Sequence, residues 1–406
     1  MAGRNGTDNL VTTGISGLDD VLGGGLQPDR LYLLEGGPGS GKTTVALQFL
    51  RAGVPRGESL LYVTLSETAR ELRAVASSHG WSLDGLTILE LMPGEEALNP
   101  DEQSTMFHPS EVELAATTRR ILEEVEHIKP TCVVIDSLSE LRLLSGNALR
   151  YRRQILALKQ YFTARQCTVL LLDDLTDSDR DLQMHSVVHA VVVLELLNPE
   201  YGADRRRLRV RKYRSMAYRS GYHDYAIRTG GVDVYPRLVA AEHRSVTERS
   251  KLASGIAELD ALLGGGLERG TSTLFVGPAG SGKSTLTAQF VSAAAARGLK
   301  AAMFVFDEST ATLLARAAAL NIDLAGGIAA GLITVKQINP AELSPGEFTH
   351  AIRTAVEQDD AAVVVIDSLN GYLNAMPAER FLIIQLHELL SIVFSLQIHQ
   401  TGSEND

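Results

Sequence analysis

The sequence contains few cysteines, few aromatic residues and no surplus of basic charge. It has 2 cysteines among 406 residues, 5% of its residues are aromatic, and its formal net charge is −11. Because Cys132 and Cys167 lie in apolar runs, we expect two inert buried thiols in a reduced, cytoplasmic protein. The acidic balance disfavours a general nucleic-acid scaffold, which is usually basic. No run approaches about 18 apolar residues, and residues 1–10 lack the apolar region of a secretory leader, so we expect no membrane association.

What the sequence does contain is a large internal repeat. TTGISGLDDVLGGGL at 12–26 returns as LASGIAELDALLGGGL at 252–267, at the offset that also separates Lys42 from Lys283 (283 − 42 = 241). A period this long predicts duplicated domains, which we place at 1–247 and 248–406. The offset falls at the Asp136 and Asp367 motifs (367 − 136 = 231), so about ten extra residues are expected in the first copy, near Met92–Ser110.

Each copy carries a glycine-rich loop of the pattern G-x-x-x-x-G-K-[ST]. The glycines let successive backbone amides close around phosphate oxygens, and the lysine adds a point charge. A plain glycine-rich turn is the alternative, but its recurrence in the same context disfavours it. The predicted phosphate-binding residues are Gly36, Gly37, Pro38, Gly39, Ser40, Gly41, Lys42, Thr43 and Thr44, with Gly277, Pro278, Ala279, Gly280, Ser281, Gly282, Lys283, Ser284 and Thr285.

The segments around these loops predict an α/β fold with mostly parallel central sheets in two tandem domains. Short apolar runs, several of them ending in acidic residues, are typical of buried parallel strands. A helix after each loop would place bound phosphate at a helix N-terminus, where free amides favour anions. The expected strands are Leu31–Leu34, Leu60–Leu65 and Thr131–Ile135, then Ser272–Val276, Ala302–Phe306 and Ala362–Ile366; the expected helices are Thr43–Arg51 and Ser284–Ala296.

Two aspartates are candidate metal ligands. Asp136 and Asp367 follow buried strands, at the sheet edge where ligands of α/β proteins gather. Hydrolysis of a nucleoside triphosphate needs a metal ion at the terminal phosphates, so we expect each aspartate to hold Mg²⁺ with the hydroxyl of Thr43 or Ser284. A helix-capping role for each aspartate is the alternative.

Hydrolysis also needs a group that orients water and positive charge at the phosphates. Glu67 and Glu308 end the second strand of each copy, and we expect them to orient the attacking water, with Asp307 beside the second. A capping role in the following helix is the alternative. Lys42 and Lys283 are expected to stabilise the charge that develops during the reaction.

A basic strand is expected at Arg205–Arg214. Alternation would place Leu208, Val210, Lys212 and Arg214 on one face and Arg207, Arg209 and Arg211 on the other. From the end of that strand, Lys212 and Arg214 could reach a phosphate of this subunit or, in a ring, of a neighbour. Binding of nucleic acid by the outer arginines stays open.

Together these motifs resemble the KaiC family of clock ATPases and their bacterial and archaeal relatives. The resemblance rests on SGLDDVLGGGL, GGPGSGKTT, VTLSET, VVIDSLSEL and RLRVRKYRSMAYRSGYHDYAI in the first copy, with GPAGSGKST and VVVIDSLNGYLNAMPAERF in the second. It implies a RecA-like fold in each domain, ATP with Mg²⁺ as ligand, and a hexameric double ring with nucleotide between subunits. It also implies slow ATPase activity and, in clock members, serine/threonine autokinase activity of the second domain.

The resemblance also assigns single residues. It implies that Ser78 contacts nucleotide and that Lys212 and Arg214 sense the phosphates of the neighbouring subunit. Two departures stand out: Ser66 precedes Glu67 where the family often has a second glutamate, and Tyr218 stands where a histidine is expected.

The second copy is expected to be incomplete. At the offset of 231, Gln397–Asn405 would answer to Gln166–Asp174, yet its polar sequence cannot form the same buried strand, and counterparts of Asp177–Tyr235 are missing. The second domain would then lack a phosphate-sensing pair and the segment that carries phosphorylated residues in clock members. We therefore expect the first domain to be the more complete catalytic unit.

Three functions remain open at this point. The first is an ATP-binding, ring-forming signalling ATPase with regulatory protein partners. The second is a DNA-dependent ATPase like the RecA, RadA or DnaB proteins, which salt-dependent binding to single strands would reveal. The third is a nucleotide-gated interaction module in which ATP stabilises the oligomer without turnover.

Overall fold

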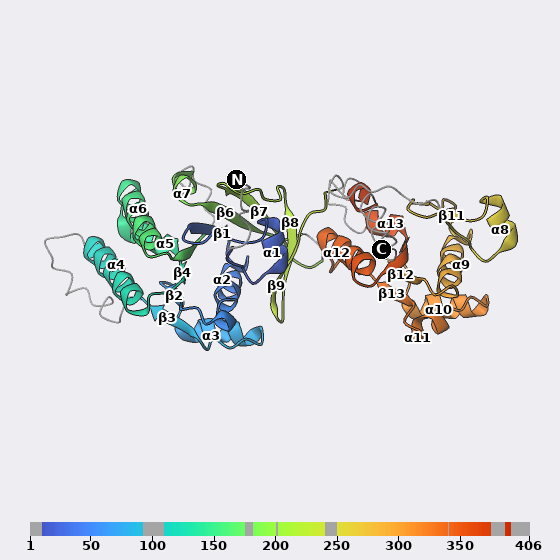
Figure 1. The fold of residues 1–406 in the computed structure, drawn as a ribbon, viewed down its shortest axis with the longest axis horizontal. Helices are drawn as coiled ribbons and strands as arrows, with labels where there is room; N and C mark the ends of the chain where they lie inside the picture. The colour runs from blue at the N-terminus through green and yellow to red at the C-terminus, as the bar shows by residue number, and fades with distance from the viewer. Residues whose placement is uncertain are drawn as a thin grey trace, which may run out of the picture. The chain divides into compact units, whose positions relative to one another are not determined.

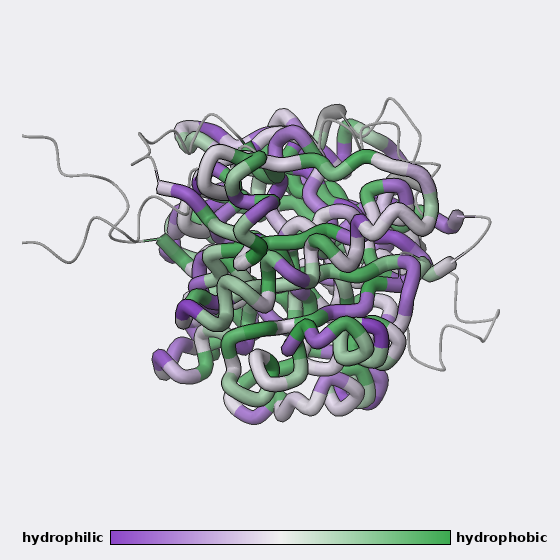
Figure 2. Tube along the Cα trace, turned by 90° about the vertical axis from the view of Figure 1, so that its right-hand side faces the viewer, coloured by the Kyte–Doolittle hydropathy of each residue, from purple (hydrophilic) through white to green (hydrophobic). Residues whose placement is uncertain are grey.

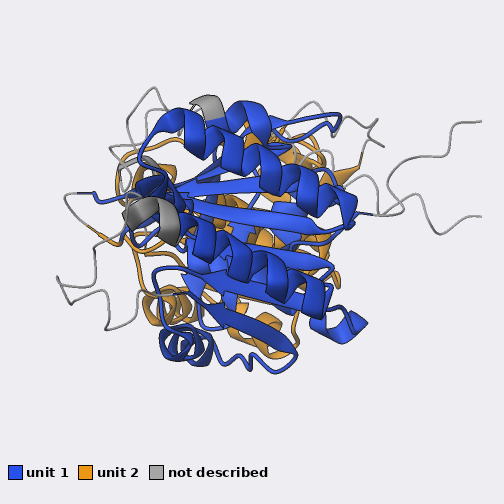
Figure 3. Cartoon of the chain, turned by 90° about the vertical axis from the view of Figure 1, so that its left-hand side faces the viewer, with its two compact units in different colours: residues 1–199, 204–237 blue, residues 200–203, 238–406 orange. Residues whose placement is uncertain are grey.

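Two α/β units make up the described part of the chain. The computed structural model describes residues 10–91, 109–174, 182–199, 202–239, 250–339, 341–374 and 386–390. Unit 1 comprises Met1–Pro199 with Asp204–Arg237, and unit 2 comprises Glu200–Ala203 with Leu238–Asp406 (Figure 3).

Unit 1 is built on a mixed sheet whose larger part is parallel. Its strand order is β3-β2-β4-β5-β1-β6-β7-β8-β9, parallel as far as β6 and antiparallel beyond it. The strands are β1 Leu31–Gly36, β2 Leu60–Thr64, β3 Leu86–Glu90, β4 Cys132–Asp136, β5 Thr168–Asp174, β6 Ala190–Leu197, β7 Arg205–Tyr213, β8 His223–Arg228 and β9 Gly231–Tyr235. β1, β2 and β4 are buried along their whole length, as expected for parallel strands with both faces covered.

Helices cover both faces of this sheet (Figure 1). Tyr32 and Leu34 of β1 pack with α1, α2 and α3, whereas Leu31 and Leu33 pack with α4, α5, α6 and α7. The helices are α1 Ser16–Val21, α2 Lys42–Arg51, α3 Ala69–Ser78, α4 Pro109–Ile128, α5 Leu138–Ser145, α6 Ala148–Ala164 and α7 Leu182–Val187, with a 3-10 turn η1 at Val54–Arg56. Figure 2 shows hydrophobic and hydrophilic stretches alternating along the trace.

The two cysteines are buried and free, as the sequence predicts. Burial raises the pKa of the Cys132 thiol to about 12 and that of Cys167 to about 11. Both side chains are therefore protonated and unreactive at neutral pH.

Unit 2 repeats the outer half of this architecture. Its described parallel sheet has the order β13-β12-β14, which matches β3-β2-β4 of unit 1. The main elements are α8 Ala257–Leu262, α9 Lys283–Ala295, β12 Lys300–Val305, α10 Thr310–Ala319, α11 Leu324–Ala329, β13 Ile333–Gln337, α12 Pro345–Glu357, β14 Ala361–Asp367 and α13 Leu369–Asn374, with a short antiparallel pair of β10 Lys251–Leu252 and β11 Leu267–Glu268. Residues 92–108 of the extra segment expected near Met92–Ser110 lie outside the described residues.

The strand expected at Ser272–Val276 is not formed. Its counterpart β1 hydrogen-bonds to β5 on one side and β6 on the other, whereas the described residues of unit 2 place no strand on either side of this segment. Leu274 is 67% exposed, while the equivalent Leu33 is 0% exposed. The apolar sequence is that of a strand, but a strand needs neighbours to satisfy its backbone groups.

The predicted basic strand forms, but the prediction of which side chains share a face is wrong at its C-terminal end. Leu208 and Val210 lie in the core with α2. A β-bulge follows them, because the pairing of β7 with β6 skips one β7 residue between Val210 and Lys212. The extra residue reverses the alternation. Tyr213 therefore joins the face of Leu208 and Val210, and Lys212 turns to the opposite face, toward α7.

Removing a leucine at equivalent positions should have very different effects in the two units. Leu33→Ala should lower the free energy of unfolding by about 2–5 kcal/mol, because it leaves a cavity in a filled core. Leu274→Ala should change it by less than about 0.5 kcal/mol, because that side chain is exposed. Urea unfolding followed by circular dichroism measures both changes, and equal costs would contradict the absence of a strand at Ser272–Val276.

The antiparallel end of the unit 1 sheet contains a histidine that is held neutral. His223 Nδ1 accepts from Arg237 N at 2.8 Å, and Nε2 donates to Arg219 O at 2.9 Å. Burial, with smaller contributions from the two arginines, lowers its pKa to about 4. The charged form is disfavoured in the fold, so His223 contributes stability that is present above pH 6.5 and is lost as the pH falls through 4.

Replacing His223 should therefore weaken the dependence of the unfolding free energy on pH in the acid range. Between pH 6.5 and 4.5 the unfolding free energy of the parent chain should fall by up to about 1.4 kcal/mol per pH unit more steeply than that of His223→Gln. Fluorescence of the single tryptophan, Trp81, which packs against the core of unit 1, follows the transition. The exposed His127→Gln is the matched control and should keep the parent slope; identical slopes for all three chains would refute this role.

Candidate nucleotide-binding site

The glycine-rich loop of unit 1 joins β1 to α2 at the carboxyl edge of the sheet. Gly39 and Gly41 have φ angles of 75° and 90°, which favour glycine. A Cβ on Gly41 would lie 2.4 Å from Cδ1 of Ile227, so the end of that side chain would have to move to admit one. Tyr225 of β8 donates to Ser40 O at 2.6 Å. The loop is thus fixed by its own glycines and by the antiparallel strands.

The loop of unit 2 has the same conformation. Gly280 and Gly282 have φ angles of 78° and 88°, and α9 begins at Lys283 as α2 begins at Lys42. In each loop the first glycine packs against a serine hydroxyl of the loop, where a Cβ would collide. Each loop therefore places a row of free backbone amides at a helix N-terminus, the arrangement that binds phosphate.

Each loop lysine folds back onto its own loop. Lys42 Nζ donates to Gly36 O at 2.6 Å, and Lys283 Nζ donates to Gly277 O at 2.8 Å. Lys42 also forms an ion pair with Asp174, with 3.1 Å between Nζ and Oδ1. Among the described residues of unit 2, no carboxylate contacts Lys283.

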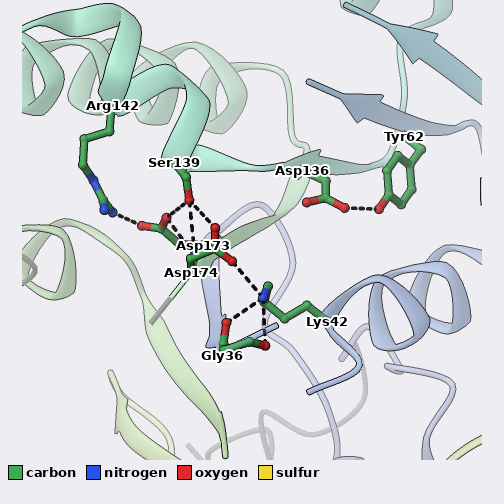
Figure 4. A network of polar contacts seen from close by, with 9 residues as sticks. Gly36, Lys42, Tyr62, Asp136, Ser139, Arg142, Asp173 and Asp174 are labelled. Carbon is green, nitrogen blue, oxygen red and sulfur yellow. Dashed lines mark hydrogen bonds and ion pairs between the residues drawn. The ribbon is translucent and has the colours of Figure 1, made fainter. Parts of the chain in front are cut away.

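The structure brings Asp136 and Thr43 together, as a shared metal ion would require. Asp136 ends β4, and Tyr62 donates to its Oδ2 at 2.6 Å (Figure 4). Burial raises the pKa of Asp136, while hydrogen bonds from Tyr62 and Thr43 and the charge of Lys42 lower it. A buried carboxylate beside a hydroxyl fits Mg²⁺, which takes one or two carboxylates and completes its shell with phosphate oxygens and water.

Asp367 occupies the equivalent place in unit 2 without the phenol. Position 303 holds methionine where unit 1 has Tyr62, and Asp367 Oδ2 is buried with no hydrogen-bond partner. A buried carboxylate oxygen without a donor is costly, and a bound cation would satisfy it. The donor set of unit 2 therefore also fits Mg²⁺. Within the described residues, no cluster of three or more His, Cys, Asp or Glu side chains forms a metal site by itself.

Glu67 has a free oxygen at this edge, whereas its counterpart is engaged. Thr64 fixes the backbone of Glu67 by donating to its carbonyl at 2.6 Å, and Glu67 Oε2 is buried without a partner. Burial is the largest cause that raises the pKa of Glu67, followed by the charge of Asp136. In unit 2, Arg316 pairs with Glu308 at 2.6 Å and Ser368 donates to Asp307.

Three residues assigned by resemblance lie in other contacts. Ser78, which ends α3, donates to Val75 O at 2.7 Å. Lys212 donates to His185 O and Val188 O, and Arg214 donates to Ser186 O, all near the end of α7. Burial and the charges of Arg214 and Lys159 lower the pKa of Lys212 to about 8.

Two outer arginines of β7 are also engaged. Arg207 and Arg209 both pair with Glu195, and both lie over the ring of Tyr222. Because part of their charge is already neutralised, this face offers less to a phosphate backbone than the sequence suggests.

Sequence reasoning missed a second layer of polar residues around Lys42. Asp173 and Asp174 end β5, and Arg142 pairs with Asp173 (Figure 4). Ser139 Oγ of α5 lies 2.9 Å from Asp173 Oδ1 and 3.0 Å from Asp174 Oδ2, so the two carboxylates share its one hydroxyl proton. A signal for the two aspartates was present, since an apolar strand runs into them as β4 runs into Asp136. Tyr62 had no such signal, because a tyrosine in a strand is ordinarily predicted to be a residue of the core.

Comparison with known proteins agrees with this geometry. The KaiC ATPase family model matches residues 11–239 and 252–399. The chain belongs to the KaiC ATPase family. Its fold is accordingly the RecA-like P-loop fold, with a large, mostly parallel sheet in unit 1 and a three-stranded parallel sheet in the described part of unit 2.

Curated relatives of the chain include clock proteins. The circadian clock oscillator protein KaiC of Parathermosynechococcus lividus is 28% identical over 379 residues, which cover 91% of this chain and 68% of that protein. Its namesake in Prochlorococcus marinus (strain MIT 9313) is 27% identical over 383 residues, covering 91% and 74%. Within the described ranges, no helix is long and apolar enough to span a membrane.

Loss of the Tyr62 hydroxyl should destabilise unit 1. Tyr62→Phe leaves a buried carboxylate oxygen of Asp136 without its donor, and we expect the unfolding free energy to fall by about 1–3 kcal/mol in metal-free buffer. Denaturation followed by Trp81 fluorescence measures the change. Tyr222→Phe, which removes a more exposed hydroxyl from Glu195, should cost less than about 0.5 kcal/mol. Equal costs would show that the Tyr62–Asp136 contact adds nothing.

Proposed function

We propose that this KaiC-family chain is a slow signalling ATPase that binds Mg·ATP at the loop of unit 1 and hydrolyses it there. One observation carries the proposal: the loop, the Thr43–Asp136 pair and the free oxygen of Glu67 meet at one edge of one sheet. Triphosphate hydrolysis needs these three functions in one place.

The loop residues Gly36–Thr44 would hold the phosphates through their backbone amides and the N-terminus of α2. Lys42 would exchange its carbonyl contacts for a phosphate oxygen, which is a stronger acceptor because it is charged. We propose that Ser78 lines the remainder of the nucleotide site. ATP in preference to GTP rests on membership of the family.

Thr43 and Asp136 would hold the metal ion. A Mg²⁺ ion held there would supply positive charge at the terminal phosphates. The burial of this pair supports the proposal. Without a metal ion, the negative charge of an ionised Asp136 is offset within the described structure only by hydrogen bonds and by Lys42.

Glu67 would orient the attacking water. Its free Oε2 can accept a hydrogen bond from water, which directs the oxygen lone pair at the terminal phosphorus. As that oxygen–phosphorus bond forms, the bond to the bridging oxygen of the nucleoside diphosphate breaks, and the carboxylate accepts the water proton. Lys42 stabilises the charge that develops on the phosphate oxygens.

We further propose a homo-hexameric ring with nucleotide at the subunit interfaces, which regulatory proteins would recognise. Lys212 and Arg214 would then exchange their contacts at the end of α7 for a phosphate of the neighbouring subunit. Their position on the α7 face, away from the core of Leu208 and Val210, leaves them free to make this exchange.

For unit 2 we propose nucleotide holding without turnover. The loop Gly277–Thr285 and the pair Ser284 and Asp367 would bind Mg·ATP, in a domain that we place at 248–406. Glu308 is tied to Arg316 and Asp307 accepts a hydrogen bond from Ser368, so neither carboxylate has a buried oxygen without a partner as Glu67 has.

Paired glutamine variants test the assignment of turnover. Glu67→Gln should lower steady-state Mg·ATP hydrolysis by about a hundredfold or more with little change in ATP affinity, because water loses its base and the phosphate contacts remain. Glu308→Gln should leave the rate within about twofold. Hydrolysis that survives Glu67→Gln, or that depends on Glu308, would refute the proposal.

A further inference from the structure

Asp174 lies beside the phosphate loop of unit 1 and contacts its lysine. It is the last residue of β5, directly opposite Gly36 in the register of β5 with β1. Its Oδ1 lies 3.1 Å from Lys42 Nζ. The Asp174 side chain is 48% exposed and that of Lys42 12%, so the aspartate is the more exposed member of the pair.

The carboxylate of Asp174 is fixed by its neighbours. Ser139 Oγ donates to Asp174 Oδ2 at 3.0 Å. The adjacent Asp173 is buried, and its charge is matched by Arg142. Among the described residues, Lys42 is the cation that contacts Asp174, and the negative charge of Asp174 extends far enough into the site to raise the pKa of Asp136.

The terminal phosphate of an incoming nucleotide needs the positive charge of Lys42, which Asp174 already neutralises. In loops of this pattern the amides hold the inner phosphates and the lysine reaches the outermost ones. A bound triphosphate would therefore bring one more charged group to the part of the site where Lys42 contacts Asp174 than a bound diphosphate would. Repulsion between carboxylate and phosphate then acts on the triphosphate more strongly than on the diphosphate.

We propose that Asp174 is a specificity-determining residue, which competes with the terminal phosphate of a nucleoside triphosphate for Lys42 and shifts the preference of the unit 1 loop toward the diphosphate. This inference rests on the proposed nucleotide binding by unit 1. Unit 2 offers an internal contrast, because Lys283 contacts only loop carbonyls among the described residues.

The test is a comparison of two nucleotides on the full chain. Lys283→Ala is introduced throughout, so that binding reports the loop of unit 1. Calorimetry then gives Kd for ADP and for the non-hydrolysable triphosphate analogue adenylyl imidodiphosphate, at one Mg²⁺ concentration. Asp174→Asn should tighten binding of the analogue about tenfold and that of ADP less than about threefold, since it removes the competing charge and keeps the shape of the side chain.

Two further variants provide a second test of the Asp174 charge and a control for the loss of a charge elsewhere in unit 1. Asp174→Ser removes the same charge with a smaller side chain, and should shift the ratio of the two Kd values in the same direction even if Asp174→Asn folds poorly. Asp233→Asn removes an exposed charge of unit 1 that has no contact with Lys42, and should leave the ratio within about twofold.

A change in the ratio of the two Kd values in both Asp174 variants, but not in Asp233→Asn, supports the inference. A ratio that does not move in the Asp174 variants, with both nucleotides still bound, overturns the role of Asp174 and leaves the proposed function standing. If the parent chain binds neither nucleotide, the proposed function fails and the inference fails with it.

Discussion

The pairing of β1 with β5 and β6 is the constraint on which the site of unit 1 depends. β1 carries the phosphate loop at its carboxyl end, and every residue of it is buried between two parallel neighbours. β5 also delivers Asp173 and Asp174 beside Gly36, and β6 connects β1 to the antiparallel strands that anchor Ser40. The position of the loop relative to the acidic residues is therefore set by backbone hydrogen bonds across the whole sheet.

Unit 2 shows which parts of the site survive without this constraint. Its loop keeps the conformation of the first, because that conformation is fixed locally by glycines with positive φ. The helix α8, which precedes the loop in the chain, does not keep its apolar side chains buried: Leu262 is 85% exposed, whereas its counterpart Val21 in α1 is 0% exposed. In the proposed function, phosphate binding would therefore depend on the local loop, whereas catalysis would depend on the strands that bring distant carboxylates to it.

Much of the fold follows from the sequence, because buried parallel strands and helix starts are local patterns. β2, β4, β12, β14, the two loops and the helices after them lie where the sequence predicts. The strand at Ser272–Val276 was wrongly predicted because an apolar run says nothing of its neighbours in space. The facing of Lys212 was wrong because strict alternation cannot reveal a β-bulge. The catalytic, nucleotide-binding and metal-binding assignments stay predictions, and the ion pair of Lys42 with Asp174 joins segments 132 residues apart, beyond any local pattern.

The central claim is that the two loops, alike in sequence, differ in what they do, and alanine substitution of each loop lysine tests it most directly. Steady-state Mg·ATP hydrolysis would be measured for the intact chain, Lys42→Ala and Lys283→Ala, with the oligomer mass of each checked. The account predicts that turnover is lost in Lys42→Ala and persists in Lys283→Ala. Loss of turnover in Lys283→Ala, with Lys42→Ala still active, would contradict it.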